Sequence, residues 1–163
     1  MLWGIVKNSL LNQLIEQAKK ELDALESAAL ATHSYATDQE FKSESKYDTR
    51  ALEASYLAEA EAKRVEELKL EIQILEEVDV DASAKYGEIS IGALVELSFN
   101  NIVKKYFLIP TAGGTVLDVD GEQVVVVSVF SPIGDAMLGL KAGDDFEVET
   151  PKFNRTYQIV SFS

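Results

Sequence analysis

The sequence predicts an α+β fold, in which an N-terminal antiparallel α-helical coiled-coil hairpin precedes a small antiparallel β domain with one short helix. Three observations support it: residues 8–42 lack glycine and proline, apolar residues recur at steps of three and four in residues 11–29 and again in residues 51–75, and the period changes to two after residue 87. A chain of 163 residues has room for one small domain and one extended element. We therefore expect a hairpin over residues 1–80 and a β domain over residues 81–163.

The first helix is predicted to begin near Asn8 or Ser9, which are suitable N-cap residues. Good helix formers then continue to about residue 42. Its apolar positions alternate steps of four and three, which is the pattern of a coiled-coil seam: Leu11, Ile15, Ala18, Leu22, Leu25 and Ala29. A seam of this kind needs a partner helix.

The second helix, over residues 49–77, provides a mirrored seam. Counted back from its end, the same steps give Leu75, Ile72, Leu68, Val65, Glu61, Ala58, Ala54 and Ala51. Large residues lie at the start of the first helix and at the end of the second, so in an antiparallel pair large side chains face large ones and small side chains face small ones. Pairing Leu11 with Leu75 places the turn near residue 43 and the tip over residues 39–48. A coiled coil that joins two chains is the alternative interpretation.

The second half of the chain contains six predicted strands. They cover residues 89–99, 104–109, 115–119, 122–130, 145–149 and 157–162. The run from Val124 to Val127 has no alternation, so we expect it to form a central strand that is covered on both faces. A short helix is predicted after it, with Ser131 as N-cap, Pro132 at the first helical position and Gly139 after its end.

The composition narrows the classes of function. A chain with 47% hydrophobic and 26% charged residues is typical of a soluble folded protein. The net charge of −13 argues against direct binding of DNA or RNA phosphates. With no cysteine and one histidine, a thiol nucleophile and a structural zinc site are excluded. These exclusions leave few enzyme mechanisms open, so we expect no catalysis by this chain alone. The apolar stretch Met1–Val6 is too short for a signal peptide or a membrane span, so we expect a cytoplasmic protein.

Residues 87–162 carry several short motifs in a recognisable order. They include Ser131-Pro132-Ile133-Gly134, Gly143-Asp144-Asp145, Thr150-Pro151 and Tyr157-Gln158-Ile159-Val160. This pattern resembles the C-terminal domain of the bacterial GreA/GreB transcription elongation factors, which implies an FKBP-like fold. The family also has an N-terminal antiparallel coiled coil, in agreement with the mirrored seams. In the family, the C-terminal domain docks on the rim of the secondary channel of RNA polymerase, and the hairpin enters that channel.

The resemblance also implies which residues bind. Polymerase contacts are expected from the short helix, at Ser131, Pro132, Ile133, Gly134, Met137 and Leu138. Acidic tip residues of the family help to hold a second Mg²⁺ at the polymerase centre, where backtracked transcripts are cleaved. Carboxylate oxygens suit Mg²⁺, and the candidates here are Asp48, Glu44 and Glu53. We expect a monomer that shares this Mg²⁺ with RNA polymerase and holds no cofactor stably.

Two other functions fit parts of the same pattern. The family has a glutamate three residues after its tip aspartate, whereas here the residue three positions after Asp48 is Ala51. This difference favours a regulator that occupies the channel without stimulating cleavage. In that case Ser45 caps the second helix, and the negative charge of Asp48 only interacts favourably with the N-terminal dipole of that helix. The FKBP-like fold also suits a prolyl isomerase, although a fold alone does not transmit activity.

Overall fold

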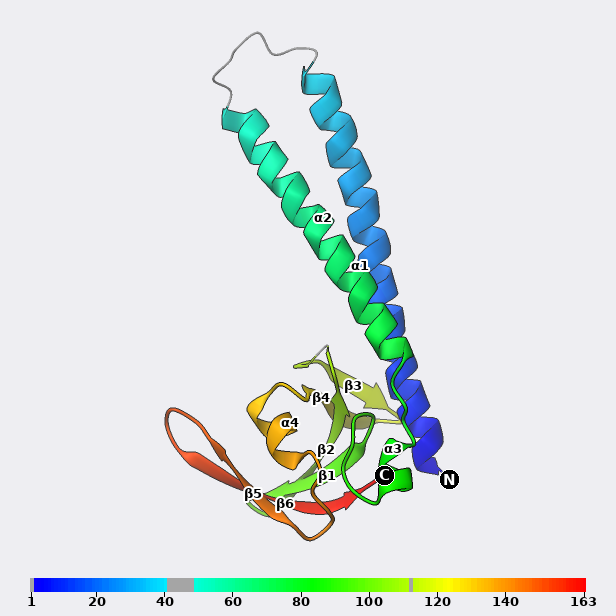
Figure 1. Ribbon diagram of the computed structural model, residues 1–163, viewed down its shortest axis with the longest axis vertical. Coiled ribbons are helices and arrows are strands. Elements are labelled where there is room, and N and C mark those ends of the chain that lie inside the picture. The colour runs from blue at the N-terminus through cyan, green and yellow to red at the C-terminus, as the bar shows by residue number, and fades with distance from the viewer. Residues whose placement is uncertain (1, 41–48, 112) are drawn as a thin grey trace. The chain divides into compact units, whose positions relative to one another are not determined.

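The computed structural model describes residues 2–40, 49–111 and 113–163. The elements follow in the order α1 (Leu2–Glu40), α2 (Thr49–Glu76), α3 (Ala82–Tyr86), β1 (Leu94–Phe99), β2 (Ile102–Ile109), β3 (Val116–Val119), β4 (Glu122–Ser128), α4 (Pro132–Met137), β5 (Asp145–Glu149) and β6 (Asn154–Phe162). A helix pair followed by a six-stranded sheet confirms the predicted fold class (Figure 1). In the described part of the chain, no helix is both long and apolar enough to span a bilayer.

The chain forms two compact units. The first comprises Met1–Ile15 and Ile74–Ser163 and is called the β unit; the second comprises Glu16–Gln73 and is called the hairpin unit. The sequence-based boundary between residues 80 and 81 follows chain order, whereas the β unit is assembled from two separate stretches. The predicted tip falls largely on residues 41–48, which lie outside the described residues.

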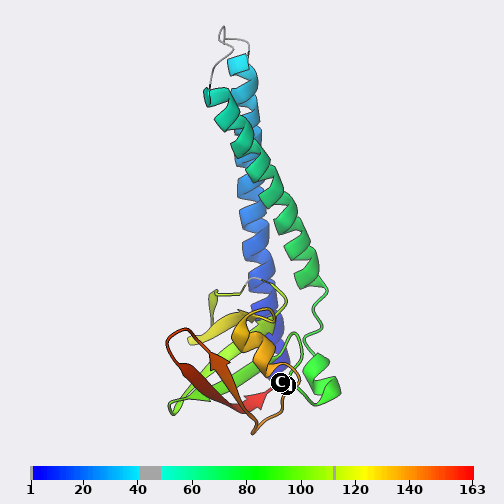
Figure 2. The ribbon, with the colours of Figure 1, turned by 60° about the vertical axis from the view of Figure 1, so that its left-hand side comes forward.

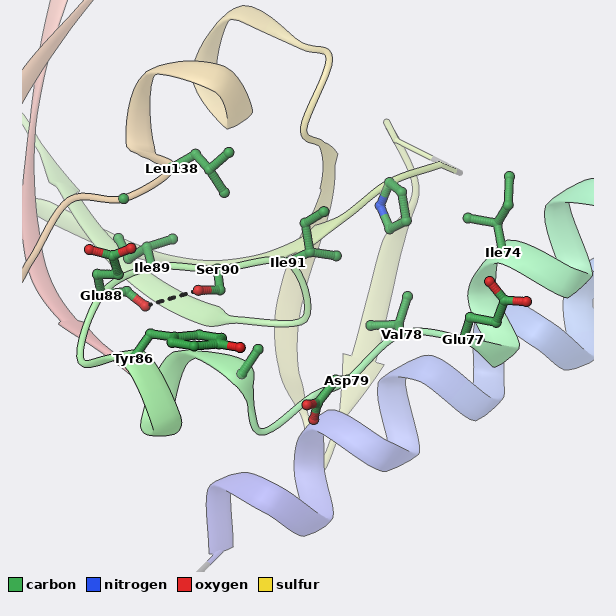
Figure 3. Close-up of a pocket in the computed structure, with 13 residues that line it drawn as sticks. Ile74, Glu77, Val78, Asp79, Tyr86, Glu88, Ile89, Ser90, Ile91 and Leu138 are labelled. Atoms are coloured by element: carbon green, nitrogen blue, oxygen red, sulfur yellow. Dashed lines mark hydrogen bonds between the residues drawn. The ribbon is translucent and has the colours of Figure 1, made fainter.

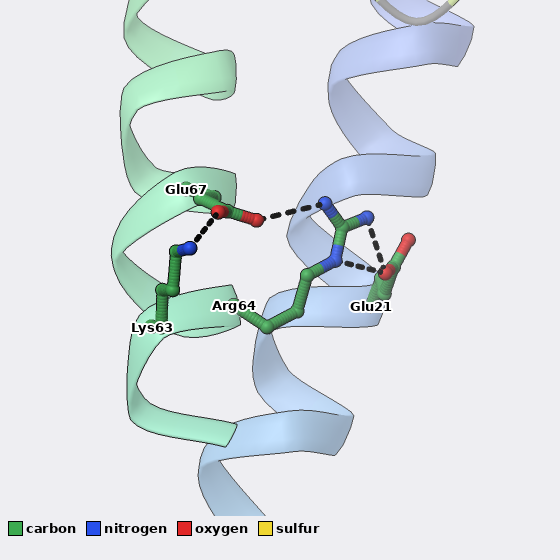
Figure 4. A network of polar contacts seen from close by, with 4 residues as sticks. All are labelled: Glu21, Lys63, Arg64 and Glu67. Atoms are coloured by element: carbon green, nitrogen blue, oxygen red, sulfur yellow. Dashed lines mark hydrogen bonds and ion pairs between the residues drawn. The ribbon is translucent and has the colours of Figure 1, made fainter. Parts of the chain in front are cut away.

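The hairpin unit is held by apolar contacts between α1 and α2. Its core contains Ala18, Leu68 and Ile72, with Leu22 and Leu25 packed against them. All five residues belong to the predicted seams. Between the helices, Arg64 also contacts Glu21 at 2.8 Å, within a small network that includes Lys63 and Glu67 (Figure 4). These charged side chains are half exposed or more, so their contribution to stability is small compared with that of the apolar core.

The second seam is less buried toward its start. Ala58 is exposed, and Glu61 is only half-buried, with one carboxylate oxygen that has no hydrogen-bond partner. Alanine removes little apolar area from water, so contacts at this end stabilise the pair weakly. The apolar contacts between α1 and α2 therefore stabilise the pair most at the end formed by Ala18, Leu68 and Ile72.

Truncation of Leu68 should be far more destabilising than a change at the exposed seam position. Leu68 is 1% exposed, so Leu68→Ala should lower the free energy of unfolding by about 2 to 4 kcal/mol. Ala58→Ser is the matched control and should change it by less than about 0.5 kcal/mol. Urea unfolding followed by circular dichroism compares the two; similar losses would contradict the burial of the seam.

The sheet of the β unit has the strand order β3-β4-β2-β1-β6-β5. Four of its five strand pairs are antiparallel, as predicted. The pair β2–β4 is parallel, with Lys105 opposite Val124 and Ile109 opposite Ser128. The parallel pair arises because β3 lies at the sheet edge and β4 returns between β3 and β2. An alternating pattern indicates strands but does not specify their direction, which explains why the sequence predicts an antiparallel sheet and misses the parallel pair.

Two apolar cores cover the two faces of the sheet. On one face, Leu10, Leu11 and Leu14 of α1 pack with Leu75 and with a set of sheet residues that includes Leu94, Phe107, Val124 and Val126. On the other face, where α4 lies over the sheet (Figure 2), Met137 packs with a second set of buried residues that includes Ile89, Leu97, Leu108, Val127, Tyr157 and Ile159. The uninterrupted valine run of β4 is therefore covered twice, as expected. The strand lies next to the edge strand β3 and not in the middle of the sheet.

The connection that follows α2 is fixed on two sides. The buried ammonium of Lys7 donates a hydrogen bond to the Val80 carbonyl oxygen at 2.6 Å. Burial lowers the pKa of Lys7, while the charges of Asp81 and Asp79 raise it. On the other side, a Cβ on Gly92 would lie 2.7 Å from the Asp79 carbonyl oxygen, and Gly92 has a φ of +91°. Glycine is therefore required for this close approach.

Candidate docking surface

The helix α4 begins with the cap that the sequence predicts. The Ser131 hydroxyl accepts a hydrogen bond from the Gly134 amide at 3.1 Å and donates one to the Ser128 carbonyl oxygen at 2.7 Å. Pro132 follows at the start of the helix, where its missing amide donor costs nothing. Gly139, with a φ of +78°, comes directly after the C-cap Leu138, and its amide bonds to the Ile89 carbonyl oxygen at 2.8 Å. The helix is thereby tied to β4 and to the segment that precedes β1.

Gly134 allows α4 to approach β4 closely. A Cβ at this position would lie 2.0 Å from the Ser128 carbonyl oxygen and 2.8 Å from its carbon. Backbone atoms cannot move away as a flexible side chain can, so any larger residue would displace the helix. Gly134 therefore has a structural role in the motif that the sequence marked for polymerase binding.

The predicted polymerase-binding residues differ in their exposure. Gly134 and Met137 are buried, and Ile133 and Ser131 are half-buried. Pro132 is exposed, and Leu138 is 43% exposed. Phe130, which no sequence motif marked, is 85% exposed directly before the cap. An aromatic residue next to a strong N-cap signal was the available clue. We define the α4 surface as Phe130, Pro132 and Leu138.

The described residues include one of the three candidate metal ligands. Glu44 and Asp48 lie outside the described residues, and Glu53 is an exposed residue of the second turn of α2. Across residues 2–40, 49–111 and 113–163, no three histidine, aspartate or glutamate side chains are grouped so that they could hold a metal ion. The geometry of a shared Mg²⁺ site therefore stays a prediction.

Comparison with known proteins gives a family model and a curated relative that match this chain. A family model described as "Transcription elongation factor, GreA/GreB, C-term" matches residues 82–163. Transcription elongation factor GreA of Rickettsia canadensis (strain McKiel) is 33% identical over an alignment of 111 residues, and the match covers 63% of this chain. The match covers 66% of that relative, so the chain spans just under two thirds of its length.

Solved structures of related proteins also match. One is GreA factor homolog 1 (Gfh1) of Thermus thermophilus, at 20% identity over 91% of this chain and 94% of the other, with a TM-score of 0.38. Another is the GreA/GreB elongation factor of Nitrosomonas europaea, at 23% identity over 47% of this chain and 60% of the other, with a TM-score of 0.34.

Proposed function

Because this chain belongs to the GreA/GreB family of transcription elongation factors, we propose that it is an accessory factor of bacterial RNA polymerase in the cytoplasm. In this proposal the β unit docks on the rim of the secondary channel, and the hairpin enters the channel. The tip carboxylates then share a Mg²⁺ with the polymerase and stimulate cleavage of backtracked transcripts. The observation that carries the proposal is the match over residues 82–163, preceded in the same chain by a helical hairpin with its own apolar core.

Two assays test this function. The purified protein should bind core RNA polymerase at micromolar concentration in low salt, and it should speed up cleavage in stalled elongation complexes. Absence of binding under these conditions would refute the proposal. Binding with no cleavage at any Mg²⁺ concentration would remove only the cleavage step.

A second candidate is a regulator that occupies the secondary channel without stimulating cleavage. One observation favours it: Ala51 stands three residues after Asp48, where the GreA/GreB tip pattern has an acid. With one carboxylate fewer, the tip has fewer oxygen ligands for a divalent ion. This candidate predicts slower elongation together with unchanged transcript cleavage.

Docking through the α4 surface predicts that an added charge at Phe130 weakens polymerase binding. Because Phe130 is almost fully exposed, Phe130→Glu should leave the fold intact. It should raise the Kd for core polymerase at least tenfold, which corresponds to about 1.4 kcal/mol. Val103→Glu is the control. Val103 is also exposed, and it lies on the same side of β2 as Phe107, which belongs to the core on the sheet face away from α4.

Fluorescence anisotropy with a labelled wild-type competitor measures both affinities, and circular dichroism confirms folding. Equal affinities of the Phe130 variant, the Val103 variant and the wild type would contradict docking through this surface.

A further inference from the structure

The β unit contains a groove that shares one residue, Leu138, with the α4 surface. The groove has a volume of about 860 Å³ and lies between the end of α2, α3 and the segment that leads into β1 (Figure 3). Its apolar lining includes Ile74, Val78, Tyr86, Ile91 and Leu138. Leu138 belongs to both surfaces, so the groove continues from the end of α4.

Three large apolar side chains of the groove remain accessible to water. Tyr86 is 72% exposed, Leu138 is 43% exposed and Ile91 is 37% exposed. Single exposed apolar residues are ordinary on protein surfaces, but several that line one concavity are typical of an interaction site. Burial of these side chains by a partner would remove apolar area from water and thereby stabilise a complex.

The charge of the groove indicates the chemistry of its partner. Glu77, Asp79 and Glu88 line it, and its lining contains no lysine or arginine from residues 2–40, 49–111 or 113–163. Asp79 forms an ion pair with Lys85 at 2.6 Å. Within the described part of the chain, Glu77 and Glu88 form no ion pair with a basic side chain. A lysine or arginine of a partner can lay its aliphatic stem on the apolar lining and place its charge beside these carboxylates.

The groove is formed before any partner binds. Its α2 side is held by the hydrogen bond from Lys7 to Val80 and by the close approach of Asp79 to Gly92. On the β1 side, Ile89 accepts a hydrogen bond from the Gly139 amide, and its own amide bonds to the Leu140 carbonyl oxygen at 2.9 Å. A preformed site loses less conformational entropy on binding than a mobile one.

We propose that this groove binds a segment of RNA polymerase that presents an aliphatic side chain next to a lysine or arginine. The inference rests on the proposed function, because polymerase is the partner that function supplies. It adds a second subsite, with apolar and electrostatic parts, beside the α4 surface. Two kinds of variant separate these parts.

The apolar part is tested with Ile91→Glu. Ile91 is exposed and lies outside the apolar cores, so the variant should fold. The expected result is at least a tenfold rise in the Kd for core polymerase. Val160→Glu, at a comparably exposed apolar position on β6 that does not line the groove, should bind like the wild type. Circular dichroism and thermal unfolding confirm that both variants are folded.

The electrostatic part is tested with the double variant Glu77→Lys and Glu88→Lys. It should weaken binding at least tenfold in low salt, and it should flatten the salt dependence of the Kd, because attraction to basic partner residues is lost. The double variant Glu147→Lys and Glu149→Lys on β5 makes the same change in net charge outside the groove and serves as control.

The outcomes distinguish the two proposals. If the wild type binds polymerase and the groove variants bind equally well, the groove inference is wrong and the proposed function stands. If the β5 control weakens binding as much as the groove variant, net charge and not the groove determines affinity, which also overturns the inference. A wild-type protein that does not bind polymerase overturns both.

Discussion

Gly134→Ala should destabilise the β unit by about 3 kcal/mol or more. The added Cβ would lie 2.0 Å from the Ser128 carbonyl oxygen, so α4 must move away from β4. That movement would disturb the capping bond from the Gly134 amide to Ser131 and the packing of Met137, which is fully buried. Urea unfolding followed by circular dichroism measures the loss.

Gly139→Ala is the matched control for this prediction. Gly139 has a φ of +78° but open space around it, so an added methyl group meets no atom within 4 Å. The only expected cost is the strain of a left-handed backbone, which is about 1 to 2 kcal/mol. A loss at Gly134 no larger than the loss at Gly139 would show that the close approach of α4 and β4 is absent in solution.

The structural role of Gly134 changes how binding data on this motif must be interpreted. Variants of Gly134 or Met137 would lose polymerase binding through loss of the α4 fold, whether or not these residues touch the polymerase. The exposed residues Phe130, Pro132 and Leu138 are the positions at which a loss of affinity reports a contact. Docking experiments should therefore combine these positions with a measurement of stability.

Local signals were sufficient to predict much of the fold. The seam residues Ala18, Leu68 and Ile72 were found because a coiled coil repeats every three or four residues, and they form the core of the hairpin unit. The Ser131 cap was found because serine before proline is a strong helix start, and the predicted hydrogen bond is present.

Features that depend on distant parts of the chain were not predicted. Leu10 and Leu14 pack against the sheet, but they lie outside the heptad positions that mark a coiled-coil seam. The partner of Lys7 is 73 residues away, and no periodicity links the two positions. Two further features could not be predicted for the same reason: the parallel pairing of β2 and β4, and the groove beside Tyr86 and Ile91. Each depends on how segments distant in the sequence pack together.

Asp48→Asn should lower the rate of transcript cleavage at least tenfold if the tip acts on the polymerase centre. Asparagine keeps the size and the capping ability of aspartate but removes the charge that a divalent ion requires. A tenfold loss corresponds to about 1.4 kcal/mol of transition-state stabilisation. Affinity for polymerase should hardly change, because we propose that the β unit is the part that docks.

Glu44→Gln and Glu53→Gln should cause partial losses of cleavage, because each removes one further candidate ligand from the same end of the hairpin. Glu59→Gln is the matched control, since Glu59 is an exposed carboxylate farther along α2 and should have no effect. Cleavage rates are measured in stalled complexes over a range of Mg²⁺ concentrations. If a variant only weakens Mg²⁺ binding, its cleavage rate recovers at high Mg²⁺; if the metal site is lost, the rate stays low. If the wild-type protein binds polymerase but never stimulates cleavage, Asp48 is only a charge at the start of α2, and the non-cleaving regulator becomes the function of this chain.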